Sequence, residues 1–311
     1  MVMPKSPILV LGALLLCGGL PSMILGQTGR PQGDSVILKE KTSLVTLTLT
    51  VTDRGGRAVT DLHPGEIEVF EDKVRQHVEF YSMADVPVSV GVIFDLSGSM
   101  SMQLDRAREA LRAFIDTSHA QDEYFLLGFQ KRAHLLADFT DGASMLRRLA
   151  PAEAHGATAL YDALYLGMEK VRRGRHRKHV LLVISDGQDN ASRYDMDELR
   201  RRMRESDVQI YCIGVNQASS SDKGAWREER RGQMILDTIA QMSGGRSFFV
   251  HTADALEAAT TRIALDLRQQ YSLGYVPTNA QPDGRWRRIQ VRVTRPSLRI
   301  RAREGYYASS E

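Results

Sequence analysis

Cysteine is nearly absent from this chain of 311 residues, which contains only Cys17 and Cys212. Cys17 lies in an N-terminal segment that we expect to be removed, and Cys212 would then be the single cysteine. One cysteine cannot form an internal disulfide, so the folded chain must be held together by packing. Cys212 lies in the apolar run Val208–Val215, where we expect a buried and unreactive thiol.

The chain also lacks a strong net charge. Its 41 Lys and Arg residues face 38 Asp and Glu residues, a balance of +3. This gives no electrostatic reason to expect nucleic-acid binding, and we interpret the basic runs Arg172–Lys178 and Arg200–Arg202 as solvated loops or helix ends. Apolar residues make up 42% of the chain and charged residues 25%, which excludes wholesale disorder.

The N-terminal segment has the three-part layout of a secretory signal peptide. Lys5 precedes the apolar run Ile8–Cys17, and small and turn residues follow up to Gly26. The run is too short to span a bilayer comfortably. We therefore expect residues 1–26 to be a signal peptide and the protein to be secreted, periplasmic or part of the cell envelope. The alternatives are an uncleaved N-terminal anchor and lipidation at Cys17, which the bulky Leu16 disfavours.

Two flanking zones show polar and apolar residues in alternation. In residues 36–85, Val45, Leu47, Leu49 and Val51 share one face, and residues 270–307 contain similar alternating runs. Such patterns predict antiparallel strands with one buried face. Neither flank alone would make a stable sheet. We therefore predict that the two flanks pair into one β-sandwich.

The middle zone, residues 86–269, has a different pattern. Continuous apolar runs such as Val88–Phe94 alternate with stretches of helical spacing, which predicts a doubly wound, mostly parallel α/β sheet inserted into the sandwich. Near its end we predict a helix over Gln233–Met242, preceded by an exposed loop at Ala218–Asp222 and Arg227–Arg231.

Oxygen-bearing side chains follow three segments at the expected carboxyl edge of this sheet, where ligands bind in open α/β folds. They are Asp95, Ser97, Ser99, Thr158 and Asp186. Hard oxygen ligands without His or Cys suit Mg²⁺, Mn²⁺ or Ca²⁺. Each motif alone could equally be a helix cap or a turn, but their convergence at one edge predicts a metal site. With few carboxylates in direct contact, the ion could accept a further carboxylate from outside.

Residues from about Val88 to Leu267 resemble a von Willebrand factor type A domain, whose metal-ion-dependent adhesion site has the pattern Asp-x-Ser-x-Ser, then Thr, then Asp. The resemblance implies direct metal contact from Ser97, Ser99 and Thr158, and contact through water from Asp95 and Asp186. It also implies a role in adhesion or assembly.

The flanks extend the resemblance to bacterial secreted proteins related to this family, through Tyr271–Tyr275, Gly284–Arg287 and Arg303–Tyr307. One departure is His155, which precedes Gly156 where relatives often have a second glycine. Its ring could border the metal, or His155 could be an ordinary surface residue. Asp189 is either a carboxylate behind the metal ligands or a turn residue.

We therefore expect an exported protein-binding module, and not an enzyme, whose partner is a protein that presents Asp or Glu to the metal. One alternative is a structural envelope protein in which the metal only stabilises the fold. Another is a Mg²⁺-dependent hydrolase or phosphotransferase with Asp95 as nucleophile, but Ser97 occupies the place where such enzymes carry a second acid. The sequence leaves the partner and the oligomeric state open.

Overall fold

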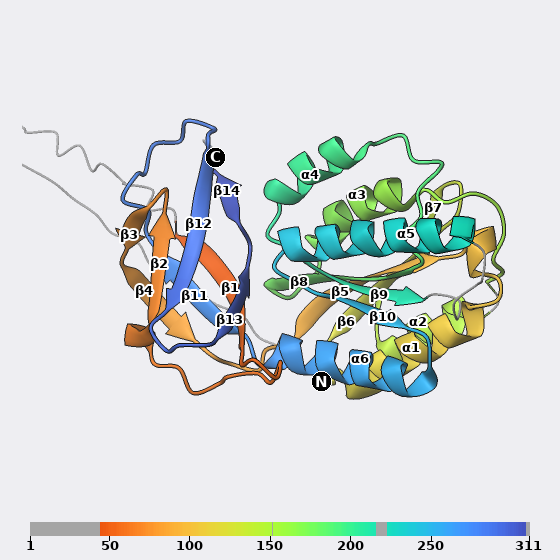
Figure 1. Cartoon of the computed structure of the whole chain (residues 1–311), viewed down its shortest axis with the longest axis horizontal. Helices are drawn as coiled ribbons and strands as arrows, with labels where there is room; N and C mark the ends of the chain where they lie inside the picture. Colours follow the sequence, from red (N-terminus) through yellow and green to blue (C-terminus); the bar gives the residue numbers. More distant parts are fainter. Residues whose placement is uncertain (1–43, 151, 216–222, 309–311) are drawn as a thin grey trace, which may run out of the picture. The chain divides into compact units, whose positions relative to one another are not determined.

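Residues 44–308, apart from 151 and 216–222, are described by the computed structural model (Figure 1). The predicted signal peptide, residues 36–43 of the first flank and the predicted loop Ala218–Asp222 therefore lie outside the described residues. Every described element belongs to one compact unit of the chain, Thr42–Glu311.

A six-stranded sheet forms the middle of the chain, in the order β10-β9-β8-β5-β6-β7. Its five parallel strands follow the predicted apolar runs, and only β7 pairs antiparallel, with β6. All eight residues of β5 are buried, as expected for a central parallel strand covered on both faces. The strands are β5 (Val88–Asp95), β6 (Glu123–Phe129), β7 (Ala133–Thr140), β8 (Lys178–Ser185), β9 (Gln209–Val215) and β10 (Ser247–Val250).

Helices cover both faces of this sheet (Figure 1). Alternate residues of β5 serve two separate cores, because Val92 and Phe94 pack toward one helical layer and Ile93 toward the other. One layer contains α1 (Leu104–Thr117), α2 (Gly142–Leu149) and α6 (Ala253–Arg268), and the other contains α3 (Leu160–Val171), α4 (Met196–Arg204) and α5 (Lys223–Met242). Within the described residues, no helix is both long and apolar enough to cross a membrane.

The flanks form two four-stranded sheets, in the orders β13-β1-β11-β4 and β14-β12-β2-β3. Each sheet combines strands from both ends of the chain, and their shared core includes Leu47, Leu49, Tyr271 and Tyr275. The predicted fold class, an α/β sheet with a flanking β-sandwich built from N- and C-terminal strands, is confirmed. These strands are β1 (Val45–Thr52), β2 (Ile67–Glu71), β3 (Val74–Gln76), β4 (Val78–Ser82), β11 (Tyr271–Tyr275), β12 (Trp286–Val293), β13 (Arg299–Ala302) and β14 (Gly305–Tyr307).

The two ends of the α/β region meet at one residue. Val88, the first residue of β5, is paired with Lys178 of β8. The Lys178 Nζ group donates a hydrogen bond to the backbone oxygen of Leu267, near the end of α6. The chain therefore leaves and re-enters the β-sandwich at neighbouring points.

Two local predictions differ from the structure. The loop predicted at Arg227–Arg231 is wrong, because α5 begins at Lys223 and contains these residues. Nearly all residues from Lys223 to Arg231 are exposed, so this part of the helix has no apolar stripe to reveal it. Its Ala, Arg, Lys and Glu residues are good helix formers that extend the buried half of α5 backwards. Strand β7 was not predicted, because it lies at the edge of the sheet and most of its residues are exposed or half-buried.

Candidate metal site

The loop after β5 holds the first three predicted ligands. Asp95 ends the strand and is fully buried, and its Oδ1 accepts a hydrogen bond from the Ser97 backbone at 2.8 Å. Its Oδ2 accepts a bond from the Ser185 hydroxyl at 2.6 Å. The hydroxyl oxygens of Ser97 and Ser99 lie 3.1 Å apart. A short 3-10 turn at Gly98–Met100 follows. The Asp95 carboxylate is thus held rigidly beside a pair of hydroxyls.

The loop that carries Thr158 is tied directly to this turn. The Gly98 backbone donates to the backbone oxygen of Gly156 at 3.0 Å, and His155 donates to that of Leu96 at 2.8 Å. A side chain at residue 98 would place its Cβ 3.3 Å from the Gly156 oxygen, so glycine permits this close approach. Thr158 itself is buried, with 2% of its surface exposed.

The loop after β8 completes the arrangement. The Thr158 backbone donates to the Asn190 side chain at 2.9 Å, which connects the second loop to the third. Asp186 Oδ1 accepts from the Gln188 backbone at 3.0 Å. Gly187 has a φ of +83° and lies against Gly232 of α5 so closely that a Cβ would be 2.3 Å from the Gly232 oxygen. All five predicted residues therefore lie on three interconnected loops at the carboxyl edge of the sheet.

The electrostatics of this edge are unfavourable without a cation. Burial, and next the negative charge of Asp186, raise the pKa of Asp95 to about 7. A buried carboxylate beside another carboxylate resists ionisation, and a divalent cation between them would remove that repulsion. Among the described residues, no group of three or more His, Cys, Asp or Glu could hold a metal ion. An ion at this edge would therefore need the hydroxyl oxygens as ligands.

The donor set fits a hard divalent ion. It offers two carboxylates and three hydroxyls, which is the chemistry that Mg²⁺ and Ca²⁺ prefer. Asp95, Ser97 and Thr158 are buried, whereas Ser99 is exposed and Asp186 partly so. One side of the site therefore faces solvent and can be reached by a ligand from outside.

The side chains of His155 and Asp189, whose roles the sequence leaves open, have partners of their own. The His155 side chain is exposed, and its Nδ1 lies 3.3 Å from the Gln130 amide. Asp189 Oδ1 accepts bonds from the Tyr161 backbone at 3.2 Å and the Ser192 hydroxyl at 2.6 Å. Asp189 is thus engaged in fixing the start of α3.

Sequence reasoning missed two supporting residues, Ser185 and Asn190. Ser185 orients the Asp95 carboxylate, and Asn190 holds the Thr158 backbone. The signal for Ser185 was its place at the end of a buried strand, which becomes informative once β8 is known to lie beside β5.

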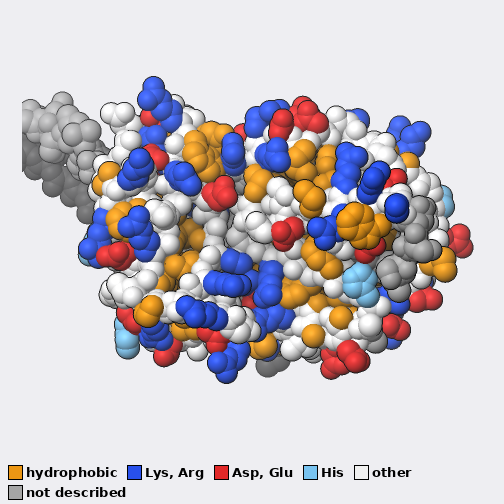
Figure 2. Space-filling model, viewed as in Figure 1, with side chains coloured by type: hydrophobic (Ala, Val, Ile, Leu, Met, Phe, Trp, Pro, Cys, Tyr) orange, Lys and Arg blue, Asp and Glu red, His pale blue; other side chains and the backbone are white. Residues whose placement is uncertain are grey.

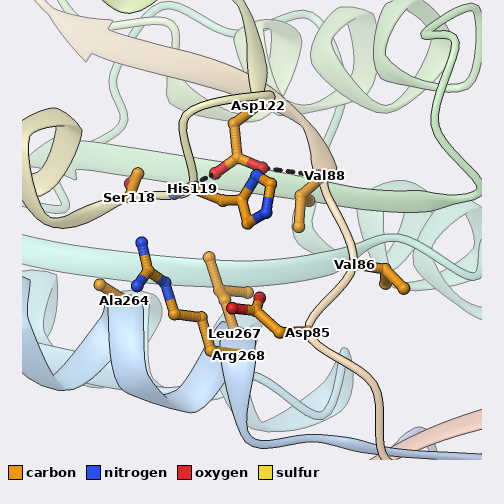
Figure 3. A pocket seen from close by; sticks show the side chains of 9 residues that line it. All are labelled: Asp85, Val86, Val88, Ser118, His119, Asp122, Ala264, Leu267 and Arg268. Carbon is orange, nitrogen blue, oxygen red and sulfur yellow. Dashed lines mark hydrogen bonds between the residues drawn. The ribbon is translucent and has the colours of Figure 1, made fainter.

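A small cavity lies at the opposite, N-terminal edge of the sheet (Figure 3). It has a volume of about 10 Å³ and is lined partly by Asp122, His119 and Arg268. The Asp122 carboxylate accepts hydrogen bonds from the backbones of Val88 at 2.7 Å and His119 at 3.0 Å. This space holds about one water molecule, and its carboxylate is already occupied, so it offers no comparable ligand site.

Comparisons with known proteins agree with the observed sheet. The sequence model of the von Willebrand factor type A domain matches residues 90–263, more than half of the chain. An uncharacterized protein of Synechocystis sp. is 26% identical over 108 residues, and the match covers 33% of this chain and 26% of that protein. The chain thus spans about a quarter of the length of this relative.

The solved structures that are similar to this chain include the following two. A von Willebrand factor type A protein from Catenulispora acidiphila is 14% identical, covering 87% of this chain and 64% of that chain, with a TM-score of 0.47. The conserved hypothetical protein BatB from Bacteroides thetaiotaomicron is 18% identical, covering 58% of this chain and 98% of that chain, with a TM-score of 0.44.

Proposed function

The chain belongs to the von Willebrand factor type A domain family, and we propose that it is an exported, metal-dependent protein-binding module for adhesion or assembly. Domains of this family mediate interactions between proteins. The observation that supports the proposal is the buried Asp95 carboxylate, which the negative charge of Asp186 repels and whose loop carries the paired hydroxyls of Ser97 and Ser99.

We assign the metal to the five predicted residues. Ser97, Ser99 and Thr158 would contact the ion directly, and Asp95 and Asp186 would contact it through water. Bound Mg²⁺, Mn²⁺ or Ca²⁺ supplies a positive centre that can accept one more oxygen ligand. The exposure of Ser99 leaves room for an Asp or Glu side chain of a partner protein to provide it.

The arrangement favours binding over catalysis. A nucleophilic aspartate needs a free carboxylate oxygen that faces its substrate, because the reacting atoms must come within contact distance. Asp95 is fully buried, and both of its oxygens already accept hydrogen bonds from Ser97 and Ser185. We therefore do not assign a hydrolase or phosphotransferase activity. With the signal peptide predicted at residues 1–26, we place the protein outside the cytoplasm.

The first test measures Mg²⁺ binding by calorimetry. Asp95→Ala should lower the affinity for Mg²⁺ at least about a hundredfold, because it removes a carboxylate behind the hydroxyl ligands. Asp105→Ala is the matched control, since the Asp105 side chain is 92% exposed on α1, and it should bind Mg²⁺ normally. An unchanged Mg²⁺ affinity in a folded Asp95→Ala protein would refute the site.

The second test concerns the partner. The full chain, with and without Asp95→Ala, is used to capture proteins from envelope extracts, and EDTA is then added. A partner that is released by EDTA and absent from the Asp95→Ala sample supports metal-dependent recruitment. Capture that is insensitive both to EDTA and to the substitution would favour a metal that only stabilises the fold.

A further inference from the structure

Helix α5 begins beyond the edge of the sheet that it covers. It connects the carboxyl end of β9 to the start of β10, so its first residues lie on the carboxyl side of the sheet. Gly232 of α5 lies beside Asp186, because a Cβ at residue 232 would be 2.2 Å from the Asp186 backbone oxygen. Residues Lys223–Arg231 precede this contact and extend the helix about 14 Å further (Figure 1). The first half of α5 therefore flanks the proposed metal site.

One face of this helix carries large exposed side chains. Trp226, Arg230 and Met234 follow each other at intervals of four residues, so they lie on the same face of α5. Trp226 is 54% exposed and Met234 is 68% exposed, and the Arg230 guanidinium lies 5.5 Å from the Trp226 ring centre. Trp, Met and Arg are the residues that are enriched where proteins bind each other. The composition and the exposure of this face therefore indicate a contact surface.

The same part of α5 is basic. Lys223–Arg231 contains four basic residues against two acidic ones, a balance of +2. Arg227 and Arg231 are exposed, and within the described residues neither they nor Arg230 form an ion pair with a carboxylate. Figure 2 shows hydrophobic and basic side chains together over α5. A surface with this charge attracts an acidic partner.

We propose that Trp226, Arg230 and Met234, together with Arg227 and Arg231, form a docking surface for an acidic segment of the partner protein. This α5 surface binds acidic side chains of the segment through its arginines and an apolar side chain through Trp226, while a further carboxylate of the same segment binds the metal. The inference rests on the proposed metal-dependent function, and it adds the chemistry by which the partner is recognised.

The test selects peptides from a phage-displayed library of random sequences, using the full chain in Mg²⁺. We expect the selected peptides to be rich in Asp and Glu and to contain an aromatic or aliphatic residue. Synthetic copies of these peptides are then titrated by calorimetry. Trp226→Ala should weaken their binding about tenfold or more, and it should fold normally because the Trp226 side chain is exposed. A thermal unfolding midpoint equal to that of the natural chain checks the fold.

The matched control is Leu265→Ala, which removes an exposed apolar side chain of α6 and should leave peptide binding unchanged. Arg227→Glu should weaken peptide binding, whereas Arg227→Lys should retain it, because the acidic peptide responds to the charge at this position. Selected peptides that are no more acidic than the library would overturn the docking surface, and so would equal binding to Trp226→Ala and the natural chain.

EDTA separates this inference from the proposed function. Peptides that EDTA releases, but that bind Trp226→Ala as tightly as the natural chain, contradict only the α5 surface. Peptides that bind equally with and without EDTA contradict the metal-dependent function. Two other occupants would also overturn the inference. A dimer in sedimentation velocity that Trp226→Ala abolishes identifies a second copy of the chain, and sedimentation with phosphatidylglycerol vesicles that Trp226→Ala abolishes identifies a membrane surface.

Discussion

Two aspartates lie at opposite ends of the parallel sheet, Asp95 at its carboxyl edge and Asp122 at its amino edge. Both are buried, and burial raises the pKa of both. Their partners differ. Asp122 accepts two backbone N–H bonds, from Val88 and His119. Asp95 accepts one backbone bond and one hydroxyl bond, and it also faces the charge of Asp186.

The difference shows that burial alone does not identify a binding site. At the amino edge the Asp122 carboxylate accepts hydrogen bonds from two backbone N–H groups and thereby stabilises the fold. At the carboxyl edge a second carboxylate and several hydroxyls are brought to the same place. Burial and a neighbouring carboxylate both work against the charged form of Asp95, and this supports the proposed metal site.

The largest effect that we expect concerns how the stability of the metal-free chain changes with pH. The pKa of Asp95 is raised from 3.8 to about 7 in the folded state. Between these values the folded chain retains a proton that the unfolded chain has lost. The contribution of Asp95 to stability is therefore greatest in acid and is lost as the pH rises through 7.

In EDTA at pH 8, Asp95→Asn should therefore be more stable than the natural chain by about 4 kcal/mol, and this advantage should fade toward pH 4. Urea unfolding of both proteins across the pH range measures the difference. A difference in the free energy of unfolding that does not change with pH would show that the pKa of Asp95 is not raised in the folded chain. Saturating Mg²⁺ should reverse the order at pH 8, because it stabilises only the chain with the carboxylate.

The opposite result is expected at the amino edge. Asp122→Asn offers one acceptor oxygen in place of two, so either Val88 or His119 loses its partner. We expect a loss of about 2 kcal/mol in the free energy of unfolding, with Mg²⁺ affinity unchanged. Urea unfolding and calorimetry on the same sample check both parts. A fall in Mg²⁺ affinity would mean that the two edges are coupled.

The smallest effect tests the orientation of Asp95. Ser185→Ala removes the hydroxyl bond to Asp95 Oδ2 and should weaken Mg²⁺ binding about tenfold. Ser89→Ala is the matched control, because Ser89 is equally buried and donates to Glu123 at 2.7 Å near the other end of β5. Calorimetry should show normal Mg²⁺ affinity for Ser89→Ala. Equal affinities for the two variants would remove Ser185 from the site.

Much of the fold could be predicted because helices and strands with a buried face have apolar residues at regular intervals in the sequence. The apolar strand Val88–Phe94 and the helix over Gln233–Met242 are found where the pattern predicts them, the latter as the second half of α5. Exposed structure leaves no such period. The outer half of α5 and the edge strand β7 were missed for this reason, since neither has a continuous buried face.

The five candidate ligands could be predicted because each follows a recognisable strand or precedes a recognisable helix. The residues that hold these ligands in place could not be predicted. Ser185 matters only because β8 lies beside β5, and Asn190 only because its loop meets that of Thr158. Which strands are neighbours is decided by packing across the whole domain, and no local pattern around Ser185 records it.

The meeting of Val88 and Leu267 at Lys178 has a consequence for the order of folding. Strands β1 to β4 leave the ribosome first, but their partners β11 to β14 are made last. Closing so long a loop is slow for an unfolded chain. A folded α/β domain holds its two ends together and reduces that loop to a short hinge. The sandwich should therefore assemble last, so any substitution that delays the α/β core leaves the edges of β1 to β4 open to aggregation.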